Sequence, residues 1–109
     1  MQRLVKTLSL KDDQSLIDEY CDVHRNIWPE IISGIKEVGV TAMDIYLLGN
    51  NLVMIIEAPD DLDLESAFNR LATMPRQQEW EEYVARFQNC GKEESSAEKW
   101  KLMSKIFEL

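Results

Sequence analysis

The sequence predicts a small α+β fold in which an antiparallel sheet carries helices on one face. Three observations lead to this prediction. Two strand-like segments at the centre of the chain flank a turn, helical periodicity follows on either side of them, and both ends of the chain are strand-like. With 109 residues, the chain has room for one domain, which spans residues 1–109.

The first strand is predicted over residues 3–10, where Leu4, Lys6, Leu8 and Leu10 alternate with Val5, Thr7 and Ser9. Asp12 and Asp13 then interrupt the alternation and offer a helix cap, with acids at the end where the helix dipole favours them. Apolar residues recur at helical spacing after this cap, which predicts a helix over about residues 13–25. Pro29 is tolerated at a helix start and not in a helix interior, so residues 26–28 should form a corner before a second short helix that stops at Gly39.

The most strand-like segments of the chain are residues 41–48 and 52–58. They flank Gly49-Asn50-Asn51, residues that accept positive φ and allow a tight hairpin. Both faces of this hairpin are largely apolar, whereas a sheet with one wet face would show a polar residue at every second position. Helices can cover one face. We expect a second copy of the same sheet, in a two-fold homodimer, to cover the other.

The second half of the chain predicts two more helices and a last strand. A turn at residues 59–63 precedes a helix with Leu64, Ala67, Phe68 and Leu71, and after Pro75 a helix follows with Trp80, Tyr83, Val84 and Phe87. Residues 88–98 are small and polar and predict an exposed loop, and residues 100–109 predict the last strand. The resulting order β-α-α-β-β-α-α-β is that of a ferredoxin-like sandwich with its helices on one side of the sheet.

Composition excludes several classes of protein. The net charge of −8 argues against a nucleic-acid partner, because such binding depends on clustered Lys and Arg. Charged residues interrupt every apolar run, so we expect no signal peptide, no membrane partner and a cytoplasmic location. Cys21 and Cys90 match no zinc or redox spacing, which predicts two reduced thiols.

The stretch from Tyr20 to Pro29 contains the single histidine of the chain, and it is where we expect the chemistry. If the helix continues through it, Tyr20 and His24 lie four residues apart and project from one face. An imidazole exchanges protons near neutral pH, and the position of His24 near a helix C-terminus predicts that its protonated form is favoured. With Asn26 and Trp28 beside it, this polar, aromatic mixture suits a small polar ligand such as a sugar.

This stretch resembles the L-rhamnose mutarotase family, and the likeness covers essentially the whole chain. The residues that carry it are Tyr20, His24, Asn26, Ile27, Trp28, Pro29, Glu30, Asp44 to Leu47, Trp80 and Tyr83. The resemblance implies a cytoplasmic homodimer of ferredoxin-like subunits, a dimeric α/β barrel, that acts as an isomerase. It would interconvert the α and β anomers of a 6-deoxy-L-hexose with no metal and no cofactor. It also implies His24 as the proton donor and Tyr20 and Trp80 as sugar contacts.

Two sugar-contacting positions depart from the family pattern. Met43 stands where rhamnose-specific members carry a tyrosine, and Trp80-Glu81 stands where they carry a Trp-Trp pair. The altered pocket makes L-fucose a competitor of L-rhamnose as the substrate. Trp28 is expected to add a second apolar face for the sugar beside Trp80.

Mutarotation opens a hemiacetal and closes it again, so a group must take the proton of the anomeric hydroxyl while the ring oxygen is protonated. His24 fits the first role, and Asp44, Glu57 and Glu81 are candidates for the second.

Other interpretations of the sequence remain open. The same dimeric fold hosts cofactor-independent monooxygenases and haem-degrading enzymes, and a non-catalytic dimeric binding module is a third alternative. Tyr20 and Trp80 could be core aromatics, and Trp28 could be a structural plug at the corner before Pro29.

Overall fold

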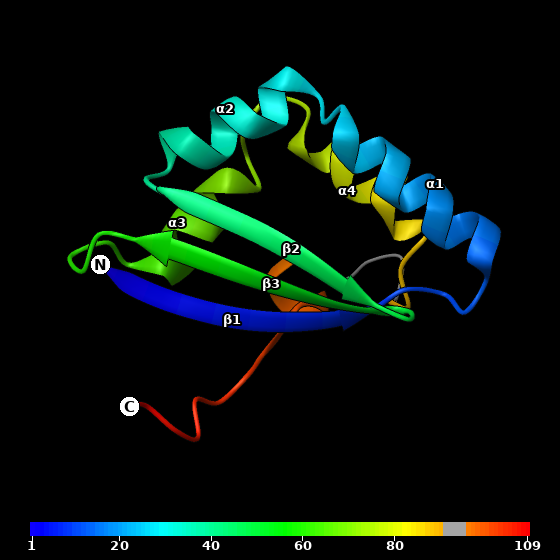
Figure 1. Cartoon of the computed structure of the whole chain (residues 1–109). Helices are drawn as coiled ribbons and strands as arrows, with labels where there is room; N and C mark the ends of the chain where they lie inside the picture. Colours follow the sequence, from blue (N-terminus) through cyan, green and yellow to red (C-terminus); the bar gives the residue numbers. More distant parts are fainter. Residues whose placement is uncertain (91–95) are drawn as a thin grey trace.

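A four-stranded antiparallel sheet carries the helices on one face in the computed structural model, which describes residues 1–90 and 96–109 (Figure 1). The strands are β1 (Gln2–Ser9), β2 (Ala42–Leu48), β3 (Asn51–Ala58) and β4 (Lys101–Leu102). Their order in the sheet is β2-β3-β1-β4, so the first strand of the chain lies between the central hairpin and the last strand. The predicted ferredoxin-like arrangement is confirmed. The sheet of one chain is open, and a closed barrel would require a second chain.

The β2–β3 hairpin forms where the sequence predicts it. Leu48 pairs with Asn51 across the turn, and Gly49 adopts a left-handed φ of 62°, which glycine accepts without steric cost. Along β3 the residues Leu52, Met54, Ile56 and Ala58 are buried beneath the helices. This alternation fixes the register, because a slip by one residue would turn these side chains to the other face.

In residues 1–90 and 96–109 the structure has five helices, of which all but the last form where the sequence predicts a helix. They are α1 (Gln14–Arg25), α2 (Pro29–Glu37), α3 (Leu64–Leu71), α4 (Gln77–Ala85) and the single turn α5 (Ser96–Lys99). Asp13 caps α1 by accepting hydrogen bonds from the backbone N–H groups of Ser15 at 2.9 Å and Leu16 at 3.3 Å. The predicted corner at residues 26–28 and the helix start at Pro29 are also confirmed.

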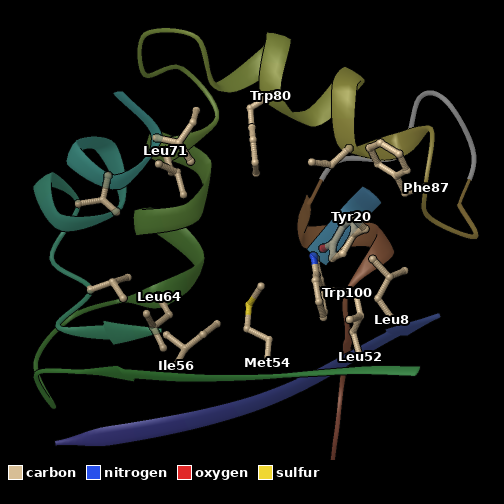
Figure 2. Packing of buried hydrophobic residues seen from close by; sticks show 14 of the residues in the cluster. Leu8, Tyr20, Leu52, Met54, Ile56, Leu64, Leu71, Trp80, Phe87 and Trp100 are labelled. Atoms are coloured by element: carbon tan, nitrogen blue, oxygen red, sulfur yellow. The ribbon is translucent and has the colours of Figure 1, made fainter. Parts of the chain in front are cut away.

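The hydrophobic core fills the space between the sheet and the helices (Figure 2). Figure 2 shows the Trp80 side chain pointing from α4 toward the sheet, while Met54 points toward it from β3. Tyr20 and Trp100 lie together at one side of this space. All four side chains are at most 9% exposed.

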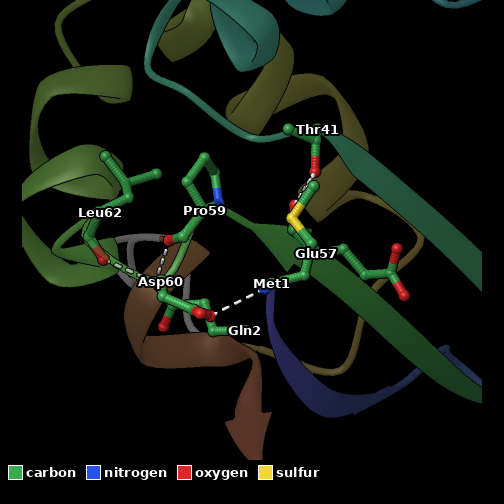
Figure 3. A network of polar contacts seen from close by, with 7 residues as sticks. All are labelled: Met1, Gln2, Thr41, Glu57, Pro59, Asp60 and Leu62. Carbon is green, nitrogen blue, oxygen red and sulfur yellow. Dashed lines mark hydrogen bonds and ion pairs between the residues drawn. The ribbon is translucent and has the colours of Figure 1, made fainter.

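A set of polar contacts holds the start of β1 against the turn between β3 and α3 (Figure 3). The amide of Gln2 donates hydrogen bonds to the backbone oxygens of Pro59 at 2.8 Å and Leu62 at 2.7 Å. The terminal ammonium of Met1 lies 3.0 Å from the Asp60 carboxylate. These contacts anchor the N-terminus of the sheet without using any group of the candidate site.

The predictions for the last part of the chain are partly wrong. An exposed loop was expected over residues 88–98, yet Gln88 is 2% exposed and Lys99, next to the predicted loop, is 3% exposed. Residues 91–95 lie outside the described part of the chain, and α5 follows them. Local polarity misleads here because Gln88 and Lys99 find polar partners inside the fold, the Tyr20 hydroxyl and the Glu81 carboxylate.

The strand predicted over residues 100–109 is also much shorter than expected. Lys101 and Leu102 pair with β1, after which the chain leaves the sheet (Figure 1). Ile106 is 95% exposed and Phe107 is 75% exposed. Strand propensity depends on a surface for the side chains to pack against, and one chain offers this tail none.

The sheet face opposite the helices is uncovered in the single chain. Tyr46 is 60% exposed and Leu48 is 83% exposed on β2, and Val53 and Ile55 continue this face on β3 with partial exposure. The expectation of two largely apolar faces therefore agrees with the structure. Within residues 1–90 and 96–109, no helix has the length and apolarity that a membrane crossing needs.

Candidate active site

A cavity of about 100 Å³ lies between the sheet and the helices. Its wall includes Tyr20 and His24 from α1, Met43 and Ile45 from β2, and Trp80 and Glu81 from α4. Of the sequence-predicted site residues, five meet at this cavity: His24, Tyr20, Trp80, Met43 and Glu81.

His24 lies in the last turn of α1 and is half-buried. Its Nδ1 is 2.8 Å from the backbone oxygen of Tyr20, and because a carbonyl only accepts, Nδ1 carries the hydrogen and donates. In the neutral ring, Nε2 then holds the lone pair that can take a proton.

The prediction that the helix terminus favours the protonated form of His24 is wrong. Burial lowers the pKa of His24 below its ordinary value, and the hydrogen bond to the Tyr20 carbonyl opposes this only in part. Because desolvation of the charged ring is the larger of the two effects, the neutral imidazole is the favoured form at neutral pH.

Tyr20 contributes a protonated phenol to the cavity. Its side chain is 3% exposed, and its ring centroid lies 4.2 Å from that of His24. Burial raises the pKa of Tyr20 to about 12, so its hydroxyl keeps its hydrogen throughout the neutral range. The amide of Gln88 donates a hydrogen bond to this hydroxyl at 3.4 Å.

The two tryptophans have different positions. Trp80 lines the cavity with its ring edge-on to His24, at 5.5 Å between centroids. Trp28 packs against Trp80 with 5.2 Å between ring centroids and stacks on Tyr83 with 5.7 Å between centroids, and the Arg76 guanidinium lies 4.1 Å from its ring centre. The cavity wall does not include Trp28, so this geometry favours a corner plug over the expected sugar contact.

A groove along the edge strand β2 adjoins the cavity. His24, Met43 and Ile45 line both hollows, together with Ile27 and Ile35. His24 therefore lies where the groove meets the cavity, a position at which a ligand entering from the edge of the sheet would contact the imidazole.

The three candidate carboxylates are separated by the fold. Glu57 lies on the open face of the sheet, where its Oε1 is 2.7 Å from Nη2 of Arg3. Asp44 lines the outer groove and not the cavity. Glu81 alone among the three shares the cavity wall with His24.

Glu81 belongs to a buried polar cluster that the sequence did not predict. Its Oε2 lies 2.8 Å from Nζ of Lys99, whose side chain is 1% exposed, and its Oε1 accepts a hydrogen bond from Gln77 at 2.8 Å. Gln77, Trp80, Glu81 and Val84 follow the spacing of one helix face, which was the available signal for Gln77 and Glu81. Lys99 gave no local signal, because it is joined to this face only through the tertiary fold.

Lys6 adds a cation to the cavity wall from the inner face of β1. Burial lowers the pKa of its ammonium, which lies 5.1 Å above the ring centre of Phe68. Among the described residues, no three His, Cys, Asp or Glu side chains come together as a metal site, and Cys21 and Cys90 are free thiols.

Comparison with known proteins decides the family. The family model for L-rhamnose mutarotase matches residues 3–109. The chain belongs to the L-rhamnose mutarotase family. It is therefore related throughout its length to sugar mutarotases, which are isomerase-type enzymes.

Individual relatives agree with this family. The chain is 36% identical over 111 residues to an L-fucose mutarotase of Xanthomonas campestris pv. campestris, covering 100% of this chain and 89% of the relative. It is 32% identical over 108 residues to a UPF0734 protein of Dictyostelium discoideum, covering 95% and 86% of the two chains.

Solved structures support the fold. The crystal structure of an L-rhamnose mutarotase from Formosa agariphila superposes with a TM-score of 0.77 at 20% identity, covering 100% of this chain and 99% of that one. The tetracenomycin F2 cyclase of Streptomyces glaucescens, a type-II polyketide cyclase, superposes with a TM-score of 0.59 at 19% identity, covering 100% and 96%. At these identities the likeness extends to the fold alone, and a cyclase shares it with a mutarotase.

Proposed function

We propose that this member of the family is a 6-deoxy-L-hexose mutarotase of the aldose 1-epimerase type, with His24 as its proton-exchanging residue. The observation that carries the proposal is a neutral imidazole at the junction of groove and cavity, beside the Tyr20 hydroxyl and the Trp80 ring. L-Fucose and L-rhamnose are both candidate substrates, because the family model and the bacterial relative are named for different sugars.

The proposed reaction uses one imidazole as a proton shuttle. Nε2 of His24 takes the proton of the anomeric hydroxyl, the C1–O5 bond breaks, and the anomeric oxygen becomes the carbonyl of the open chain. His24 then gives the proton to O5, so the free aldehyde sugar is neutral and the imidazole returns to its resting form. Rotation about the C1–C2 bond and the reverse steps close the ring as the other anomer.

The surrounding residues fit a supporting role. The hydrogen bond from Nδ1 to the Tyr20 carbonyl fixes the tautomer that leaves the Nε2 lone pair available. The Trp80 ring offers an apolar face for the C–H side of a pyranose, and Tyr20 offers a hydroxyl donor. The comparisons lend no support to a monooxygenase, a haem-degrading enzyme or a purely binding module, and the cytoplasmic location stays a prediction.

Saturation-transfer NMR of the α and β anomeric protons tests the proposal directly, with L-fucose and L-rhamnose measured in parallel. The wild type should accelerate exchange of at least one of the two sugars. His24→Gln should lose about 10²- to 10⁴-fold of that acceleration, the range for a positioned acid or base. Arg25→Gln, a change at the neighbouring exposed residue, is the matched control and should exchange as the wild type does.

Two results would refute this function. One is a folded wild type that accelerates neither sugar, and the other is a His24→Gln variant that keeps full exchange. Near-ultraviolet circular dichroism of each variant establishes that the core is intact.

We also propose that the protein is a homodimer in which a second copy covers the open sheet face, as the partly exposed Tyr46, Leu48, Val53 and Ile55 suggest. The apolar tail, with Ile106 and Phe107, is available to join the same interface. Two open sheets facing each other would form the dimeric α/β barrel expected from the family.

A further inference from the structure

The cavity wall contains a glutamine amide that is satisfied at only one end. Gln77 lies in the first turn of α4 and is 5% exposed. Its Nε2 donates to Glu81 at 2.8 Å, while its Oε1 is buried and has no hydrogen-bond partner among the residues that the structure describes. Gln77, whose Oε1 lacks a donor, is thus one of the residues that line the cavity beside His24.

The orientation of this amide is fixed by its neighbours. Glu81 can only accept when ionised, so the NH₂ end of Gln77 must face it, and a flipped amide would set two acceptors against each other. Lys99 holds the other oxygen of the same carboxylate at 2.8 Å. Because this ion pair keeps the Glu81 carboxylate in place, the NH₂ group of Gln77 stays turned toward it. Gln77 Oε1 therefore points away from Glu81 and can only accept a hydrogen bond from another donor.

A purely structural role does not account for a glutamine at this position. Gln77 lies on the same helix face as Trp80 and Val84, where an apolar side chain would pack without a polar end left over. A buried acceptor with no donor lowers stability, and native proteins rarely keep one. A hydroxyl of a bound ligand would supply the missing hydrogen.

We propose that Gln77 is a specificity-determining residue that accepts a hydrogen bond from a ring hydroxyl of the bound sugar, and that Glu81 and Lys99 are its positioning residues. The inference rests on the proposed function, since it takes the ligand of the cavity to be a pyranose. An oxygen held as an acceptor favours a sugar with a hydroxyl at the facing carbon and disfavours the corresponding deoxy sugar, which leaves the acceptor unpaired.

The test compares Gln77→Met with Gln78→Met. Methionine matches glutamine in length and removes the acceptor, and Gln78 is the exposed neighbour on the same helix. Sugar binding is followed by tryptophan fluorescence, because Trp80 and Trp100 line the cavity, and anomeric exchange is followed by NMR over a range of concentrations. The panel contains L-fucose, L-rhamnose and the 2-, 3- and 4-deoxy analogues of the better substrate.

Gln77→Met should raise Kd and KM about tenfold or more and leave kcat within about threefold, because the bond is made in the bound sugar as well as in the transition state. One deoxy analogue should bind the wild type at least about tenfold more weakly than the parent sugar and bind Gln77→Met as the parent does. Gln78→Met should match the wild type in every measurement.

The positioning role has its own readout. In Glu81→Gln the amide of Gln77 is free to turn, so the discrimination between the parent sugar and that deoxy analogue should fall toward the value for Gln77→Met. A loss of stability alone would lower the amount of folded protein and leave this ratio unchanged.

The outcomes separate the two proposals. If the wild type exchanges a sugar and Gln77→Met binds the whole panel as the wild type does, the role of Gln77 is overturned and the mutarotase function stands. If the wild type neither binds nor exchanges L-fucose or L-rhamnose, both are overturned. If Gln77→Met fails to fold, sugar binding is measured with Gln77→Asn instead, because the shorter amide cannot reach Glu81 and the sugar together. Unchanged sugar binding in Gln77→Asn would overturn the inference.

Discussion

The buried pair between Glu81 and Lys99 gives the sharpest prediction for stability. The Lys99 side chain is 1% exposed and that of Glu81 is 21% exposed, with 2.8 Å between Nζ and Oε2. Removing one partner of a buried pair typically costs about 3–5 kcal/mol, because the remaining charge is left uncompensated. The unequal burial of the two ends predicts unequal costs for the two single variants.

Glu81→Gln should cost the more, about 3–5 kcal/mol in the free energy of unfolding, because it leaves an ammonium group with almost no access to water. Lys99→Met should cost less, about 2–3 kcal/mol, because the Glu81 carboxylate keeps its hydrogen bond from Gln77 and some access to solvent. The double variant removes both charges. It should lie within about 1 kcal/mol of the wild type, since replacing a whole buried pair is often close to neutral.

Urea unfolding at pH 7, followed by far-ultraviolet circular dichroism, measures all four proteins under two-state analysis. Lys105→Met is the matched control, because Lys105 and Glu108 also lie 2.8 Å apart but are 66% and 76% exposed. Water and salt screen such an exposed pair, so it contributes little to stability. The reasoning fails if the double variant costs the sum of the two single variants, or if Lys105→Met costs as much as Glu81→Gln.

Three further predictions concern pH, backbone conformation and assembly. Burial lowers the pKa of His24 in the folded state, so as the pH falls the unfolded chain takes up a proton at this residue before the folded chain does. The unfolding free energy of the wild type should therefore fall between pH 7.5 and 5.5 more steeply than that of His24→Gln. Parallel slopes in urea titrations would contradict this. Gly39→Ala should lower the free energy of unfolding by about 1–2 kcal/mol more than Gly49→Ala does, because of added steric strain. An added Cβ at Gly39, with a φ of +107°, would come within 3.0 Å of a leucine side chain, whereas one at Gly49, with a φ of +62°, would meet open space. Equal melting temperatures of the two variants would argue against this. The double variant Tyr46→Asp/Leu48→Asp should sediment as a folded monomer in analytical ultracentrifugation, because burying unpaired charges in the proposed dimer interface is too costly. A wild type that sediments as a monomer would rule the dimer out.

Local sequence signals were sufficient for most of the fold and for the centre of the site. The four-residue spacing of Tyr20 and His24 placed both side chains on one helix face, and Asp13, Pro29 and Gly49 marked boundaries that the structure shares. These features depend only on residues that lie close together in the sequence, so they can be predicted from the sequence alone.

The tertiary structure decided which residues share the cavity and in what state. Lys99 pairs with Glu81 from a different helix, Trp28 packs against Trp80 and is not part of the cavity wall, and burial lowers the pKa of His24 where the helix terminus was expected to favour its protonated form. None of these follows from periodicity, because burial and long-range contacts depend on how the elements pack together. The sequence by itself determined most of the helices and strands and the types of functional group available to the protein. The packing of α1, α4 and α5 over the sheet determined which side chains meet at the cavity and which protonation states burial favours, because burial penalises a charged group that has no partner.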